Sequence, residues 1–143
     1  MEKIAVIGGG AAGMMASIFA ARRGMEVHVY EKNEKTGKKL YITGKGRCNL
    51  TNACDMEELL ESVKSNKKFL YSAFYGFTNQ DAYDFFEAEG LKLKVERGNR
   101  VFPVSDRSAD VLDTLRRAMR SAGVQVHLNT EVKSVRKQED GFT

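Results

Sequence analysis

The sequence predicts an α/β fold, in which a parallel sheet with flanking helices forms a Rossmann-like domain. Three observations predict it. An apolar run enters a glycine-rich turn in IAVIGGGAAG, residues 4–13; a helix of small residues follows that turn; and the next strand ends on an acidic residue. Because the turn has almost no side chains, we expect another molecule to approach the backbone there.

The first two strands and the helix between them are expected to form one β-α-β unit. Lys3–Ile7 is predicted to be a buried strand, Ala11–Arg23 a helix, and Glu26–Glu31 an alternating strand. The segment Lys32–Asn52 has three glycines and no helical period, so a loop or short hairpin is expected there. The unit and its loop make up residues 1–54.

Residues 55–104 are predicted to form a small helical and β-hairpin insertion. Asp55 and Thr78 each stand three positions before an acidic residue, which is typical of a helix start. Eight of the 13 aromatic residues lie between positions 69 and 86 at the spacing of an apolar helix stripe. We interpret them as a small core rather than as a base-stacking platform. Leu91–Glu96 and Arg100–Val104 are expected to pair as an antiparallel hairpin.

Residues 105–143 are expected to form a helix and the strands that follow it. Arg107–Ala122 has a helical apolar face, and Val124–Leu128 and Glu131–Lys137 alternate like strands. Parallel partners are found for only one side of the first strand, so the fold is expected to be incomplete at the C-terminus. The chain is then the N-terminal part of a protein roughly two to three times its length. The unpaired edge Ile4–Ile7 favours self-association.

Positive charge is concentrated in one loop. The chain holds 23 basic and 19 acidic residues, and Glu31–Arg47 holds six basic and two acidic ones, which leaves 17 of each elsewhere. This balance argues against a nucleic-acid partner, since such proteins spread Lys and Arg over a face, whereas a local cluster suits a phosphate-bearing small molecule. No apolar run is long enough for a membrane helix and no secretory leader is recognised, so we expect a cytoplasmic protein without a membrane partner.

The glycines of the first turn follow a spacing that binds dinucleotides. Gly8, Gly10 and Gly13 fit G-x-G-x-x-G, and Glu31 ends the next strand 18 positions later. In this context the first glycine makes the turn, the second admits a pyrophosphate onto free helix N–H groups, and the third lets helix and strand pack closely. Glu31 would accept hydrogen bonds from a ribose diol and repel the 2′-phosphate of NADP. NAD and FAD remain, and the cationic loop favours FAD. The alternative is a tight turn with no ligand.

Three stretches resemble a bacterial NAD(P)/FAD-dependent oxidoreductase family that includes a reductase of bile-acid intermediates. They are IAVIGGGAAGMMAS with EKNEKTGKKL behind it, ITGKGRCNLTN at residues 42–52, and RVFPVSDRSADVLDTL at residues 100–115. Members are similar in fold to the FAD half of glutathione-reductase-type enzymes, which implies a Rossmann-like FAD-binding domain. Lys45 departs from the pattern, because a third glycine is common there.

The resemblance also implies roles for individual residues toward FAD. It places Gly8, Gly10, Ala11, Ala12 and Gly13 at the pyrophosphate, Glu31 at the adenosine ribose, Lys32 and Lys39 along the AMP half, Gly46, Arg47, Cys48 and Asn49 on the path toward the flavin, and the backbone of Val132 at the adenine edge. No catalytic residue is assigned within this chain.

The activity that the resemblance implies is an FAD-dependent oxidoreductase that reduces a small organic substrate with NAD(P)H. This chain would supply the ADP-binding part of the FAD site and be inactive alone. A non-catalytic dinucleotide-binding or redox-sensing module is the alternative.

The cysteines and histidines are interpreted as structural. Cys48 and Cys54 lack a zinc-type spacing, so no metal is expected. Five residues separate them, one more than in the C-x4-C redox pair of related flavoproteins, which argues against a redox disulfide. His28 and His127 lie inside strand patterns.

Overall fold

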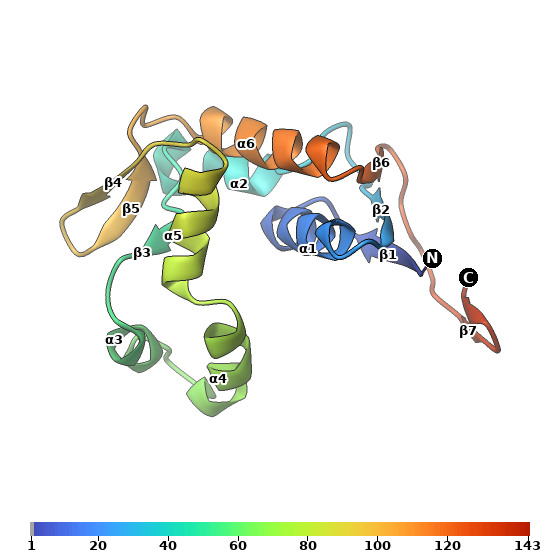
Figure 1. Ribbon diagram of the computed structural model, residues 1–143, viewed down its shortest axis with the longest axis horizontal. Helices are drawn as coiled ribbons and strands as arrows, with labels where there is room; N and C mark the ends of the chain where they lie inside the picture. The colour runs from blue at the N-terminus through green and yellow to red at the C-terminus, as the bar shows by residue number, and fades with distance from the viewer. Residues whose placement is uncertain (1) are drawn as a thin grey trace. The chain divides into compact units, whose positions relative to one another are not determined.

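The computed structural model describes residues 2–143, which form two compact units. The first unit runs to Lys39 and resumes over Leu115–Thr143, and the second unit is Leu40–Thr114. Most of their elements are labelled in Figure 1.

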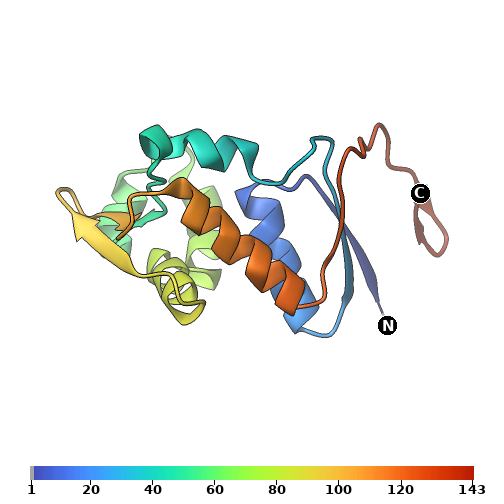
Figure 2. The ribbon, with the colours of Figure 1, turned by 90° about the horizontal axis from the view of Figure 1, so that it is seen from above.

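A parallel sheet is the centre of the first unit. Strand β1 (Lys3–Ile7) pairs with β2 (Glu26–Tyr30), which pairs with β6 (Gln125–His127), so the sheet order is β1-β2-β6. Helix α1 (Ala11–Arg22) connects the first two strands and lies on one side of them (Figures 1 and 2). The predicted β-α-β unit and the Rossmann-like α/β fold are therefore confirmed.

The two faces of this sheet differ in burial. Val27 and Val29 are at most 1% exposed, as are Met14 and Ile18 of α1, because the helix covers the face from which the valines project. Tyr30 projects from the opposite face, since side chains alternate along a strand. Burial of the valine face fixes the register, because a slip of one residue would turn the apolar side chains to solvent.

The second unit holds short helices and an antiparallel sheet. In chain order its elements are α2 (Lys38–Ile42, which begins in the first unit), the 3₁₀ turn η1 (Thr43–Gly46), β3 (Thr51–Asn52), α3 (Met56–Glu61), α4 (Lys67–Gly76), α5 (Asn79–Ala88), β4 (Leu93–Glu96) and β5 (Arg100–Pro103). The sheet order is β3-β5-β4. The hairpin and the helix starts are confirmed: Asp55 accepts a hydrogen bond from the Glu58 N–H, and Thr78 forms a capping box with Asp81.

The prediction of a loop or short hairpin over residues 32–52 was wrong in part. Helix α2, the turn η1 and strand β3 all form within it. Strand β3 pairs with β5 through Thr51 and Val101, a partner 50 positions away that no local pattern reveals. Helix α2 has only five residues, too few to show a helical period.

Helix α6 (Ser108–Ser121) and the residues after it complete the chain. Its predicted inner face, which includes Val111 and Leu115, is at most 2% exposed. The prediction of a strand over Glu131–Lys137 was wrong, because no strand of the described chain pairs with residues 131–136; Val132 and Val135 instead line a groove beside β1. Only Lys137 joins a strand, β7 (Lys137–Gln138), which forms the predicted terminal hairpin with β8 (Gly141–Phe142). No helix within residues 2–143 has the length and apolarity to cross a membrane.

Strand β1 has one unpaired edge within the described part of the chain. Glu2 accepts a hydrogen bond from β2 through its carbonyl oxygen, and Gly8 donates one to β2 through its N–H. In a parallel ladder these even-numbered positions point toward the partner strand, so the backbone groups of Ala5 and Ile7 point away from it. Ile7 is 58% exposed, and a groove of about 570 Å³ lies beside Ile4 and Phe142.

We expect this edge to pair with a second copy of the 143-residue chain. Ala5→Pro should abolish the association and leave the fold intact, because the N–H that it removes lies on the unpaired edge. Val6→Pro, which removes a bond to β2, should instead lower thermal stability. Sedimentation velocity and circular dichroism check both variants, and an association that persists in Ala5→Pro places the interface elsewhere.

Candidate functional site

The turn after β1 is shaped by two glycines. Gly8 has φ +98°, which favours glycine, and its N–H donates to the carbonyl oxygen of Tyr30 at 2.8 Å. A Cβ added to Gly13 would lie 1.9 Å from the carbonyl oxygen of Gly8. The first turn of α1 therefore packs directly on the strand end, and only glycine fits at position 13.

The start of α1 presents unpaired N–H groups. Gly10 precedes the helix with φ −78° and ψ −175°, and no side chain among the described residues caps it. The N–H groups of Ala11, Ala12 and Gly13 belong to the first helical turn and have no intrahelical acceptor. Gly10, Ala11 and Ala12 are exposed, and the first turn holds no acidic residue. These donors and the helix dipole favour an anion at this position.

Glu31 ties this turn to the loop after β2. Its Oε2 accepts a hydrogen bond from the Gly9 N–H at 2.7 Å, and its Oε1 accepts from the backbone and side chain of Asn33 at 2.8 and 2.6 Å. Burial alone would raise the pKa of Glu31, but the bonds from Asn33 and Gly9 outweigh it and lower that pKa. Glu31 is therefore ionised at neutral pH. The Glu31 carboxylate thus accepts three hydrogen bonds from the protein, and a carboxylate can accept about four.

The loop after Glu31 packs against Gly9. The Gly37 N–H donates to the Gly9 carbonyl oxygen at 2.8 Å, and a Cβ on Gly9 would lie 2.8 Å from Cγ2 of Thr36. Arg116 holds Thr36 in turn, since Nη2 donates to the Thr36 carbonyl oxygen at 2.8 Å and Nε donates to Oγ1 at 3.2 Å. Sequence reasoning missed Thr36 and Arg116, which are 80 positions apart. Asn33 was also missed, although an Asn two residues after a carboxylate is a local turn signal.

The remaining candidates of the first unit lie around this centre. Lys32 and Lys39 are exposed. Val132 is half-buried and lines the groove beside β1 together with Ile4 and Tyr30. The structure thus brings Gly8–Gly13 together with Glu31, and Val132 lines a groove that also includes Ile7 and Tyr30, the residues directly before Gly8 and Glu31.

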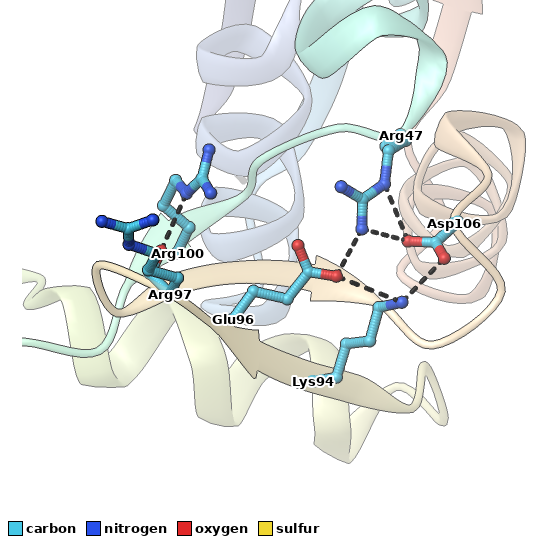
Figure 3. Close-up of polar contacts among 6 residues, drawn as sticks. All are labelled: Arg47, Lys94, Glu96, Arg97, Arg100 and Asp106. Atoms are coloured by element: carbon cyan, nitrogen blue, oxygen red, sulfur yellow. Dashed lines mark hydrogen bonds and ion pairs between the residues drawn. The ribbon is translucent and has the colours of Figure 1, made fainter.

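Arg47 belongs to an ion network inside the second unit (Figure 3). Its Nε and Nη2 donate to Oδ1 of Asp106 at 2.9 and 2.5 Å, and Nη2 also contacts Oε1 of Glu96 at 2.5 Å. Lys94 donates to Oδ2 of Asp106 at 2.7 Å, and the Arg47 guanidinium lies 4.1 Å from the centroid of the Phe102 ring. The cations lower the pKa of Glu96 and Asp106. Two carboxylates balance two cations, so Arg47 contributes little net charge to its surroundings.

The residues beside Arg47 shape the local backbone: Gly46 and Cys48 have left-handed conformations, and Asn49 forms hydrogen bonds with backbone carbonyl groups. Gly46 and Cys48 have φ +83° and +59°. The side-chain amide of Asn49 faces the carbonyl oxygens of Val101 and Thr51, at 3.2 and 3.1 Å, and its nitrogen donates to both. Asn49 therefore holds β5 beside the start of β3.

Neither cysteine is activated as a nucleophile, and the two histidines contact each other. Burial raises the pKa of the buried Cys48 thiol and of Cys54, where Glu58 and Asp55 raise it further, so neither favours a thiolate. Nδ1 of His28 lies 2.9 Å from Nε2 of His127 on one face of the first sheet. Among residues 2–143, no three ligating side chains gather as a metal site.

Glu31→Gln should lower the free energy of unfolding by about 1–3 kcal/mol at neutral pH, because the donors of Gly9 and Asn33 lose their charged acceptor. The folded-state pKa of Glu31 lies below its ordinary 4.5, so this stabilisation is fully present above pH 4.5 and is lost as the pH falls through the folded-state pKa. Denaturant titrations of both proteins should therefore converge in acid. Glu139→Gln, on an exposed residue, is the control, and a pH-independent difference would contradict this role.

Comparison with known proteins agrees with this architecture. The model of the HI0933-like protein Rossmann domain matches residues 2–143. The chain is 34% identical over 144 residues to a 3-dehydro-bile acid delta(4,6)-reductase of Clostridium scindens, covering 99% of this chain and 34% of that protein. It is 33% identical over 138 residues to a ribosomal RNA dihydrouridine synthase of Escherichia coli K12, covering 96% of this chain and 34% of that protein.

A solved structure shares the fold. The open conformation of a flavocytochrome c3 fumarate reductase superposes with a TM-score of 0.62 at 23% identity, covering 97% of this chain and 29% of that one. The chain spans about a third of the length of the curated relatives that it matches. The family match covers every described residue, and the chain belongs to the HI0933-like family as its Rossmann domain.

Proposed function

We propose that this chain binds the ADP half of FAD at the turn between β1 and α1, as part of an FAD-dependent oxidoreductase. The observation that carries the proposal is Gly10. Its φ of −78° is open to any residue, and a Cβ there would meet nothing within 4 Å. No contact in the described chain therefore requires glycine at this position, whereas a pyrophosphate lying on the N–H groups of Ala11 and Ala12 does.

Glu31 supports a dinucleotide with an unmodified ribose. Its carboxylate is ionised and has one acceptor position left for a ribose hydroxyl. The same charge would repel a 2′-phosphate, which disfavours NADP in this site. The roles of Lys32, Lys39, Gly46, Arg47, Cys48, Asn49 and Val132 toward FAD stay predictions.

FAD, when bound, would supply the two-electron chemistry. The residues of this chain bind and orient it: the first turn of α1 neutralises the pyrophosphate, and Glu31 orients the adenosine. NAD(P)H is the proposed electron donor. A small organic molecule is the proposed substrate, which agrees with the relative named as a 3-dehydro-bile acid delta(4,6)-reductase. Action on ribosomal RNA is a second candidate, because the E. coli relative is nearly as similar to this chain. The local charge cluster favours the small molecule.

Gly10→Ala should weaken FAD binding by about tenfold or more, because its methyl group occupies the path of the pyrophosphate and no protein atom. The melting temperature should fall only slightly, since Gly10 is the N-cap of α1 and alanine is less favourable there. Gly76→Ala is the matched control: its added methyl also meets no atom within 4 Å, at the end of α4. Fluorescence titration with FAD and thermal melts of the full chain measure both. Equal FAD affinity in the parent and Gly10→Ala would refute the site.

A further inference from the structure

A cavity in the first unit lies outside the glycine turn. It has a volume of about 570 Å³ and is bounded by the last turn of α6, by β6 and by the loop at Lys35–Thr36. No residue from Gly8 to Gly13 lines it, and neither does Glu31. Its volume is within the range of small-molecule sites.

The floor of this cavity is formed by apolar side chains of β6 and the residue that follows it, which are only partly covered by other residues. Val126 stands opposite Val29 in the parallel register and projects from the same face. Val29 is fully buried, whereas Val126 and Leu128 are each 39% exposed. Met119 of α6 and Val124 extend this apolar surface.

The rim of the cavity is cationic. Lys35, Arg116 and Arg120 line it, and none of its described lining residues is a carboxylate. The two hydrogen bonds to Thr36 fix the Arg116 guanidinium, so little side-chain freedom is lost when an anion binds. Guanidinium groups beside an apolar floor are suited to a molecule that carries an oxyanion at one end.

We propose that this cavity binds an anionic amphiphile, a molecule with an apolar body and one carboxylate, sulfonate or phosphate head. The apolar body covers Val126 and Leu128, and the head lies among the three cations. This site is separate from the proposed FAD site, and its test does not depend on FAD.

Two fluorescent probes with the same aromatic body test the proposal: 1-anilinonaphthalene-8-sulfonate, and N-phenyl-1-naphthylamine, which lacks the sulfonate. Arg120→Glu should weaken binding of the sulfonate probe by about tenfold or more, and change binding of the neutral probe by less than about twofold. Arg117→Glu is the matched control, because Arg117 is exposed on the same helix and does not line the cavity. Circular dichroism verifies that each variant is folded.

Three further measurements decide the location and the head group. Val126→Asp should weaken both probes, while Phe142→Asp, in the groove beside β1, should weaken neither. Decanoate or decyl phosphate should displace the sulfonate probe, and displacement by either one supports the site. The proposal is overturned if neither displaces it, if Arg117→Glu acts as strongly as Arg120→Glu, or if Phe142→Asp alone weakens it.

Discussion

The hydrogen bond from the Gly9 N–H to the Glu31 carboxylate joins the two segments on which the candidate site depends. One segment is the turn that leads into α1, and the other is the loop that follows β2. The bond is 2.7 Å long and buried. With the Gly37 N–H on the Gly9 carbonyl oxygen, it fixes both backbone groups of one glycine. An ionised carboxylate thus lies beside the positive end of a helix, where an anionic ligand and a ribose can be recognised together.

Charged side chains are paired in both units. In the first unit, Lys3 pairs with Glu26 and Lys38 with Glu34. In the second unit, the cations Arg47 and Lys94 are paired with Glu96 and Asp106. The net positive charge of the segment 31–47 therefore overstates its attraction for phosphate, because carboxylates more than 45 positions away balance Arg47. A charge count over neighbouring residues cannot detect this pairing, because the partners are far apart in the sequence.

The fold of the first unit follows from local pattern. Apolar alternation, a glycine turn and a helix of small residues identify β1, α1 and β2, and their parallel pairing follows from the connection between them. The sequence also indicates Glu31 as a site residue, because the end of the second strand lies beside the first turn in such a unit. Residues that act through distant contacts could not be predicted. Arg116 reaches Thr36 across 80 positions, and Asp106 reaches Arg47 across 59.

The sequence-based prediction of strands failed where the formation of a strand depends on a backbone partner rather than on the pattern of side chains. Residues 131–137 alternate like a strand, yet residues 131–136 find no strand partner in the described part of the chain. Strand β3 has only two residues, and it forms because its backbone pairs with that of β5. Such elements depend on the assembled fold, and a pattern read along the chain does not contain that information.

In the proposed site, a dinucleotide lies on the first turn of α1. Amide chemical shifts of the nitrogen-15-labelled chain during titration with FAD test it most directly. We expect the N–H resonances of Gly10, Ala11 and Ala12 to move together and saturate with one dissociation constant. Shifts confined to residues outside the turn and the Glu31 loop, or no shifts at saturating FAD, would contradict it.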